Sequence, residues 1–179
     1  MKKIIQLSTL TLVFISLIAC MKADKKPNLV LSDKENLVQE ILSLTDTSLK
    51  KVVKTDGEWK KELTENSYSI LRHQATEQPF NNAYHDNHEV GNYFCAGCKL
   101  PLFNSKTKFD SGTGWPSFYA PIEINRVVEV TDKSLGMVRG EIVCARCDGH
   151  LGHVFDDGPN PTGLRYCMNS GSLIFQKSK

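Results

Sequence analysis

The chain has 179 residues, of which 40% are hydrophobic and 23% charged, and its formal net charge is +2 at pH 7. This length predicts one domain, and the composition is that of an ordinary folded body. So small a net charge creates no field that would gather nucleic acid, so we expect no nucleic-acid partner.

The beginning of the chain has the features of an export signal. Lys2 and Lys3 precede an almost wholly apolar run over residues 4–18. A membrane-spanning helix needs about 20 apolar residues, and this run is shorter and contains serine and threonine. We therefore expect a signal peptide over residues 1–19, with a transmembrane helix as the weaker alternative.

The residues Leu17-Ile18-Ala19-Cys20 are similar to the lipobox of bacterial lipoproteins. This resemblance implies cleavage before Cys20 and its acylation, and hence a lipid anchor on the periplasmic side of a bacterial membrane in the cell envelope. Several acyl chains would hold the protein stably, because a single chain binds only marginally. Ordinary secretion is the alternative. Cleavage would remove both lysines and bring the formal net charge from +2 to zero.

Residues 20–55 are expected to form a lipidated N-terminus and a polar tether. The segment Ser32-Asp33-Lys34-Glu35 has the spacing of a helix capping box. The apolar residues Leu37, Val38, Ile41 and Leu42 follow it, so a short amphipathic helix is predicted there. We assign this helix no chemistry.

From Asp56 to the end, the sequence predicts a mainly β domain over residues 56–179. One short helical piece is expected around Trp59 to Leu71, ending before Pro79 because the residue preceding a proline disfavours helix. The later apolar runs are short and separated by glycine and proline, which is typical of antiparallel strands. They lie at residues 127–130, 138–144, 153–155 and 173–175.

The six cysteines fall into two pairs and two single residues. The pairs are Cys95 with Cys98 and Cys144 with Cys147, and both have C-x-x-C spacing. Two such pairs supply four thiolates, the closed tetrahedral shell of a structural zinc ion. Disulfides are the stronger alternative, because export would bring the chain to an oxidising compartment. A thioredoxin-like redox motif is the weaker one, since no βαβ pattern surrounds either pair.

Cys167 is the unpaired cysteine that lies outside the expected anchor. The pattern of its segment predicts a strand. In a strand, residues two apart face the same way, so Arg165, Cys167 and Asn169 would share one face. A cation beside a thiol favours the reactive thiolate. The alternative is that Cys167 is a small buried apolar residue.

Two histidines and one tryptophan are the remaining candidates. His150 and His153 follow the second cysteine pair closely, and a histidine can donate a proton near neutral pH. Taken singly, each is more often a surface or hydrogen-bonded residue. Trp115 lies beside Pro116 in a glycine-rich stretch, where it could form a rigid apolar wall or simply fill the core.

Four stretches of the sequence match motifs of one enzyme family. They are CAGC at 95–98, FDSGTGWPSF at 109–118, HLGHVFDDGP at 150–159 and RYCMNS at 165–170. In this order they resemble the B-type methionine sulfoxide reductases, from roughly Trp59 to the C-terminus. The resemblance implies two antiparallel β-sheets with short peripheral helices. It also implies reduction of the R-epimer of methionine sulfoxide in proteins or peptides, a repair of oxidative damage.

The resemblance also implies roles for individual residues. Cys167 would be the nucleophile, and its attack on the sulfoxide sulfur would leave a sulfenic acid. The remaining roles are zinc binding by Cys95, Cys98, Cys144 and Cys147; a methyl-binding wall at Trp115; contacts around the sulfoxide by His150, His153 and Asn169; and further substrate contacts by Phe155 and Arg165. Either histidine could be the proton donor.

One position departs from the family pattern. Many members carry a resolving cysteine between the two glycines of the Gly-x-Gly-Trp motif, and Thr113 occupies that position here. With Cys20 acylated and four thiols bound to zinc, no internal partner remains for Cys167. We therefore expect an external reductant, either a thioredoxin-like protein or a small thiol, and a monomeric enzyme.

Two other classes of protein would also explain part of the sequence. A zinc-ribbon-like binding module would account for the four paired cysteines, but it leaves Cys167, the histidines and Trp115 without a role. A secreted protein held by disulfides would use Cys167 for intermolecular pairing. Zinc content and a thiol count under denaturing conditions separate these hypotheses.

Overall fold

The computed structural model describes residues 49–179. The predicted signal peptide, the acylation site at Cys20 and the helix predicted around residues 37–42 lie outside the described residues. Within residues 49–179, no helix combines the length and the apolar character that crossing a membrane requires.

Two short helices form where the sequence predicts one helical piece: α2 (Asp56–Glu62) and α3 (Glu65–His73). Thr55 caps α2 in a capping box with Glu58. The chain becomes extended at Leu63, and Thr64 then caps α3 by accepting a hydrogen bond from the Ser67 amide at 3.1 Å. A threonine side chain that satisfies a free helical N–H favours a new helix start over continuation, which explains the break.

The strands form two antiparallel sheets, as predicted. The order is β2-β1-β9 in the smaller sheet and β3-β4-β8-β7-β6-β5 in the larger. The smaller sheet contains β1 (Gly91–Cys95), β2 (Pro101–Asn104) and β9 (Leu173–Lys177). The larger contains β3 (Lys108–Phe109), β4 (Ser117–Phe118), β5 (Val127–Asp132), β6 (Arg139–Cys144), β7 (His150–Phe155) and β8 (Arg165–Met168).

Four of these strands, β5, β6, β7 and β9, coincide with the predicted apolar runs. Short 3₁₀ helices connect several strands: η2 (Ser105–Thr107), η3 (Ile124–Arg126), η4 (Ser134–Gly136) and η5 (Ser170–Ser172). Because β7 begins at His150, both candidate histidines lie on a strand and not in a loop.

An aromatic cluster joins the two sheets. Tyr93 on β1 and Phe103 on β2 meet Phe118 on β4, with ring centroids 5.0 and 4.5 Å from the Phe118 ring. Tyr166 on β8 adds a further ring beside Phe103. All four side chains are buried, and burying each stabilises the fold by roughly 1.5–3 kcal/mol.

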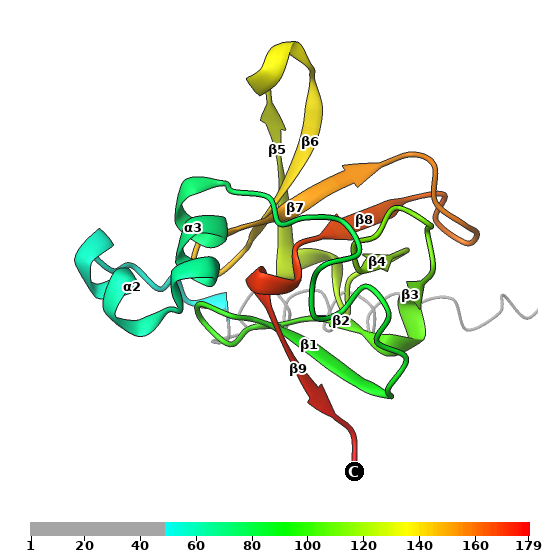
Figure 1. Cartoon of the computed structure of the whole chain (residues 1–179), viewed down its shortest axis with the longest axis horizontal. Helices are drawn as coiled ribbons and strands as arrows, with labels where there is room; N and C mark the ends of the chain where they lie inside the picture. Colours follow the sequence, from blue (N-terminus) through cyan, green and yellow to red (C-terminus); the bar gives the residue numbers. More distant parts are fainter. Residues whose placement is uncertain (1–48) are drawn as a thin grey trace, which may run out of the picture. The chain divides into compact units, whose positions relative to one another are not determined.

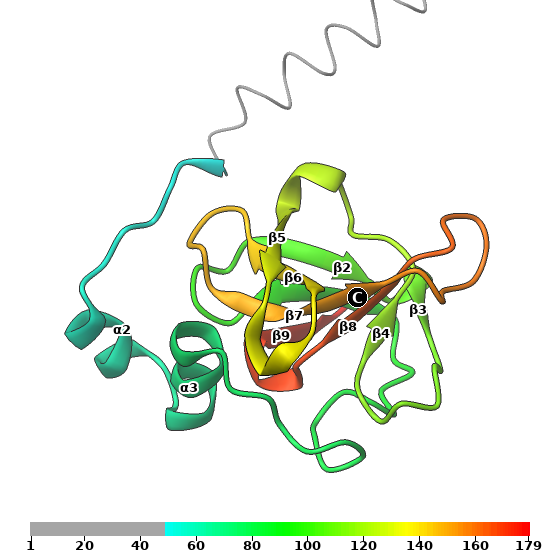
Figure 2. The ribbon, with the colours of Figure 1, turned by 90° about the horizontal axis from the view of Figure 1, so that it is seen from above.

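The helices and the β7–β8 connection lie at opposite ends of the sheets (Figures 1 and 2). Helix α3 packs against β7 and against η5, which follows the C-terminal end of β8. The loop after α3, which begins at Gln74, therefore starts beside the strands that carry the histidines and Cys167.

Candidate active site and metal centre

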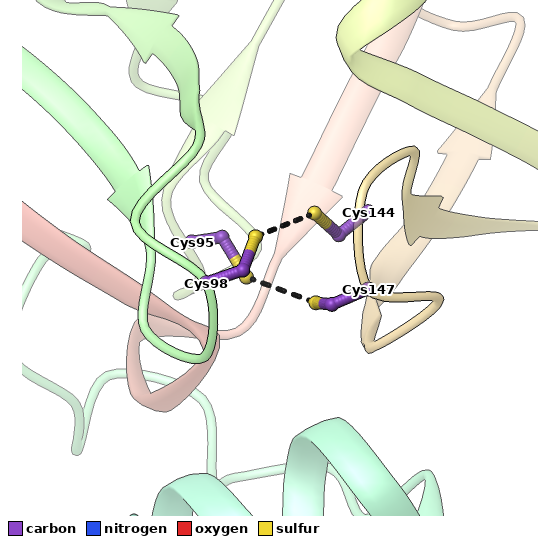
Figure 3. A group of neighbouring side chains, drawn as sticks. All are labelled: Cys95, Cys98, Cys144 and Cys147. Atoms are coloured by element: carbon purple, nitrogen blue, oxygen red, sulfur yellow. Dashed lines mark hydrogen bonds between the residues drawn. The ribbon is translucent and has the colours of Figure 1, made fainter. Parts of the chain in front are cut away.

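Two turns of the same construction hold the paired cysteines. Cys95 ends β1 and Cys144 ends β6, and each carbonyl accepts a hydrogen bond of 2.9 Å from the amide four residues further on. Those amides belong to Lys99 and Asp148, both in the left-handed region with φ of 63° and 55°. The turn directs both sulfurs of each pair to the same side, as Figure 3 shows for all four side chains.

The four sulfurs form one compact group. All lie within 4.8 Å of one another, with the Sγ atoms of Cys95 and Cys147 3.6 Å apart and those of Cys98 and Cys144 3.5 Å apart. A tetrahedral zinc ion with Zn–S bonds of about 2.3 Å would place its sulfurs roughly 3.8 Å apart. A disulfide requires about 2.05 Å, and all five described cysteines are free thiols. The geometry therefore fits a four-thiolate metal centre and not disulfides.

The metal centre joins the two sheets and is covered by the helices. One pair begins at the last residue of β1 in the smaller sheet, and the other begins at the last residue of β6 in the larger sheet. Leu71 of α3 and Trp59 of α2 are buried against the turns, and a side chain added at Gly97 would contact both of them. A bound ion would thus connect distant parts of the chain from a shielded position.

Cys167 lies in the middle of the larger sheet. Strand β8 runs between β4 and β7, and Cys167 is directly opposite Ser117 on one side and His153 on the other. Side chains of directly opposed residues share a face of the sheet, about 5 Å apart. The flanking residues Tyr166 and Met168 are buried in the core, which agrees with the predicted alternation along this strand.

A small pocket opens over this face of the sheet. Its volume is about 130 Å³. The lining residues are Thr76, Trp115, Arg139, Gly152, His153, Phe155, Cys167, Met168 and Asn169. A side chain at Gly152 would lie 2.1 Å from the Cys167 carbonyl oxygen, so glycine is required where β7 passes β8. Five predicted site residues therefore surround one pocket: Trp115, His153, Phe155, Cys167 and Asn169.

The Cys167 thiol is largely removed from water. Burial raises its pKa, because desolvation disfavours the thiolate. Hydrogen bonding from Thr113, whose Oγ1 is 4.0 Å from Sγ, opposes this shift, as do the Arg165 charge and Ser117. The Cys167 thiol thus lies in surroundings that disfavour its anion, beside groups that favour it.

Trp115 and Asn169 are held by the same residue of the loop after α3. The Glu77 carbonyl accepts a hydrogen bond of 3.1 Å from the Trp115 indole N–H. Its amide donates to the Asn169 Oδ1 at 3.2 Å, while Asn169 donates to the Leu151 carbonyl. The Glu77 carboxylate accepts from the amides of Ser170 and Gly171. Backbone and side chain of Glu77 together fix one wall of the pocket.

The two predicted histidines have different surroundings. His153 lines the pocket, and its Nε2 is 2.9 Å from Asp132, which also accepts a hydrogen bond of 2.6 Å from Arg139. Hydrogen bonds from Ser134, and then from His153 and Arg139, hold the pKa of Asp132 below its usual range. Asp132 therefore remains a carboxylate that orients the His153 ring.

His150 is buried behind His153, with ring centroids 5.4 Å apart. Its Nδ1 is 2.6 Å from Glu141, and it is not among the residues that line the pocket. Burial lowers the pKa of His150, and the Glu141 carboxylate opposes that shift. His150 thus packs against His153 without lining the pocket.

Arg165 is beside the pocket but does not line it. Its guanidinium makes two hydrogen bonds to Asp157, at 2.8 and 2.9 Å, and lies 4.3 Å from the centre of the Phe155 ring. This arrangement holds Phe155 in the pocket wall and leaves a positive charge near Cys167.

Several residues of this site were not predicted from the sequence. Asp132 on β5 directly faces the pocket residue Arg139 across the sheet, and Glu141 on β6 directly faces the pocket residue His153. A charged residue inside an apolar strand was a usable signal for Glu141, whereas Asp132 is the last residue of β5 and had no such signal. Thr76 and Glu77 lie some ninety positions before Ser170, and no local pattern marks them.

The fold and the site define a thiol-dependent enzyme of the two-sheet β class, with a separate four-cysteine metal centre. Comparison with known proteins agrees. The SelR domain family matches residues 63–177. The chain is 58% identical to a peptide methionine sulfoxide reductase MsrB of Thiobacillus denitrificans over 122 residues, which are 68% of this chain and 92% of that protein.

Two further relatives bear the same name. The chain is 56% identical to one from Leptospira interrogans over 126 residues, 70% of this chain and 96% of that protein. It is 54% identical to one from Herminiimonas arsenicoxydans over 125 residues, 70% of this chain and 91% of that protein. The chain belongs to the SelR family of B-type methionine sulfoxide reductases, which confirms the predicted family.

Proposed function

We propose that this protein reduces the R-epimer of methionine sulfoxide in oxidised polypeptides, with Cys167 as the nucleophile. The observation that carries this assignment is the pocket in which Cys167 lies directly opposite His153 and beside Trp115. A single thiol, a potential proton donor and an apolar wall meet there. A sulfoxide needs all three, because its sulfur becomes electrophilic as its oxygen is protonated and leaves.

The reaction transfers one oxygen atom. The Cys167 thiolate attacks and bonds to the sulfoxide sulfur while a proton reaches the sulfoxide oxygen. The S–O bond of the substrate and the new S–S bond then break as the hydroxyl oxygen passes to Cys167. The products are methionine and the Cys167 sulfenic acid, the first step of the thiol oxidation ladder. The sulfoxide is reduced by two electrons, and the cysteine is oxidised by two.

We assign proton delivery to His153. It lines the pocket opposite Cys167, whereas His150 is buried behind it. Asp132 would hold the His153 ring in place for the transfer. Trp115 and Phe155 would receive the methyl group, and the Arg165 charge would favour the attacking thiolate.

Zinc is the metal we propose for the four-cysteine centre. The S–S spacing fits four Zn–S bonds, and four thiolates are a typical shell for structural zinc. Such a shell leaves no open position for a substrate. Cys95, Cys98, Cys144 and Cys147 would therefore stabilise the fold and take no part in the reaction.

The sulfenic acid would be reduced by an external thiol. Thr113, and not a cysteine, lies 4.0 Å from the Cys167 sulfur. A first thiol would displace water to form a mixed disulfide, and a second would release Cys167 and leave as the oxidised disulfide. A thioredoxin-like protein or a small thiol has the required chemistry.

Mass spectrometry after one turnover without reductant tests this route. The expected product is a Cys167 sulfenic acid that a small thiol converts to a mixed disulfide. Thr113→Cys is the matched control, because a cysteine there is close enough to form a disulfide to Cys167. An internal disulfide in the unsubstituted protein would refute the external route.

We propose that a lipid anchor at Cys20 holds the enzyme on the periplasmic side of a bacterial membrane, over a tether ending near residue 55. The lipobox-like residues Leu17 to Cys20 support this. Fractionation of cells that produce the full chain or Cys20→Ser provides the test, with the acylated peptide detected by mass spectrometry. A soluble full chain without acyl groups would refute the anchor.

We also propose that the enzyme acts as a monomer, because one chain by itself supplies the nucleophile Cys167, the proton donor His153 and the apolar wall at Trp115. Light scattering on the chain without its signal peptide tests this. A stable dimer would contradict it.

Turnover of defined epimers is the direct test of the activity. Peptides that contain the R- or the S-epimer should be compared with the intact protein and with Cys167→Ser. We expect reduction of the R-epimer by the intact protein alone. Equal turnover by both proteins, or turnover by neither, would refute the assignment.

A further inference from the structure

We propose that a groove beside the catalytic pocket binds the main chain of the oxidised polypeptide. This inference rests on the proposed function, since it concerns the same substrate. The groove has a volume of about 390 Å³ and shares Thr76 with the catalytic pocket. Its other polar lining residues include Asn66, Gln78, Asn81, Asn82 and Ser170. A polypeptide that places one side chain in the catalytic pocket therefore has the groove next to it.

The floor of the groove is held in place by hydrogen bonds. The Asn82 amide donates to the Gly114 carbonyl at 2.7 Å and accepts from the Ser170 hydroxyl at 2.7 Å. That hydroxyl also accepts from the Tyr84 amide at 3.0 Å. At Gly171, a Cβ atom would be 2.4 Å from the Asn66 side chain, so the two walls approach closely. The groove exists before any ligand binds.

Three amide side chains line the groove without protein partners. Asn66, Gln78 and Asn81 are exposed, and their amides make no hydrogen bond to another residue of the described chain. A primary amide donates and accepts, and so does each peptide unit of a main chain. These side chains therefore match a polypeptide backbone, whatever its sequence.

The lining carries almost no charge that would select side chains. Glu77 is its one acidic or basic residue among those the structure describes. The Glu77 carboxylate is already engaged by the amides of Ser170 and Gly171, and burial raises its pKa. A repair enzyme must accept methionine sulfoxide in many sequence contexts. A neutral groove that reads only the backbone satisfies this requirement.

The experiment compares two substrates of the intact enzyme. One is a five-residue peptide with a central R-methionine sulfoxide and alanine on both sides, and the other is N-acetyl-R-methionine sulfoxide. Each of Asn66→Ala, Gln78→Ala and Asn81→Ala should raise KM for the peptide about threefold, and the triple variant by more than tenfold, because each loses roughly one hydrogen bond. The peptide kcat and both constants for the small substrate should stay within about twofold.

Gln176→Ala is the matched control, because Gln176 is exposed on β9 and outside the groove. Melting temperature and metal content should be unchanged in all variants. Equal losses on both substrates, or no loss on either, would overturn the proposal. If the unsubstituted enzyme reduces neither substrate, the function itself is wrong, and that outcome is distinguishable.

A second variant should gain a preference for peptides with one sign of flanking charge. Asn81→Asp places a charge in the neutral groove, so it should favour a peptide with lysine beside the sulfoxide over one with glutamate by about threefold or more. The unsubstituted enzyme should treat these two peptides alike. A variant that remains indifferent to the flanking charge would contradict a peptide in this groove.

Discussion

The metal centre and the catalytic strand use the same side chain for opposite purposes. At the metal centre, four sulfurs lie within 4.8 Å of one another in a shielded space between the sheets. At the catalytic strand, Cys167 is the single thiol among the residues that line the pocket, with His153 opposite and Thr113 4.0 Å away. The neighbours of a thiol therefore determine its chemistry.

The difference has a physical basis. A metal ion bound by four thiolates has no free position, so those sulfurs lose their reactivity and stabilise the fold instead. Cys167 keeps a free electron pair but lies in a desolvated pocket, where burial raises its pKa. Its reactivity must come from Arg165, Thr113 and the bound substrate. Substitutions of the metal ligands, of Cys167 and of its neighbours test this distinction.

Removing one metal ligand should have the largest effect. Cys144→Ser leaves three thiolates, and we expect loss of the metal and a stability loss of about 5 kcal/mol or more, given the large binding free energy of structural zinc. Metal analysis and thermal denaturation measure both. Cys167→Ser is the control that should retain the metal. Full metal content and an unchanged melting temperature in Cys144→Ser would contradict a structural centre.

Removing the catalytic sulfur should abolish activity and leave the fold intact. Cys167→Ser should lower kcat/KM for the peptide R-epimer about a thousandfold or more, because no nucleophile remains. Its melting temperature should be within about 1 °C of that of the unsubstituted protein, since serine is nearly isosteric. Steady-state kinetics and calorimetry separate the two effects. An active Cys167→Ser would remove the basis for the comparison.

Replacing the proton donor should have an intermediate effect. His153→Gln should lower kcat about a hundredfold, because a general acid contributes at least that factor. His88→Gln is the matched control, since His88 is exposed and outside the pocket. The measurement is kcat at saturating peptide, with metal content checked. Equal activity in the two variants would exclude His153 as the donor.

The pH dependence of Cys167 should show the smallest effect. Because burial raises the pKa of Cys167, its thiolate forms only as pH rises, and alkylation by iodoacetamide should have its midpoint at a higher pH than that of an ordinary exposed cysteine. Arg165→Met removes a charge that favours the thiolate, so it should lower the alkylation rate at pH 8. The rate is followed by mass spectrometry of the Cys167 peptide.

Two controls accompany that measurement. Arg165→Lys keeps the charge and should recover part of the rate, while Lys61→Met, on the exposed side of α2, should have no effect. A faster reaction in Arg165→Met, or a midpoint well below pH 8, would show that burial does not dominate the environment of Cys167.

The sequence alone determined the local features of this protein. Two residues between cysteines place both sulfurs on one side of a single turn, so spacing predicted a four-cysteine group, and its sulfurs lie within 4.8 Å of one another. Alternation along β8 predicted that Cys167 and Asn169 share one face, and both line the same pocket. The short apolar runs separated by glycine and proline also predicted antiparallel strands. All of these depend on residues a few positions apart, whose geometry the backbone largely sets.

The contacts between residues far apart in the sequence depend on the tertiary structure. Cys98 and Cys144 are 46 positions apart, and Glu77 reaches Ser170 across 93 positions. The pairing of His153 with Asp132 and of His150 with Glu141 follows from the order β8-β7-β6-β5 in the larger sheet. Strand order and register depend on the packing of the whole core, so no local pattern reveals these contacts. That packing separates one reactive sulfur from four structural ones.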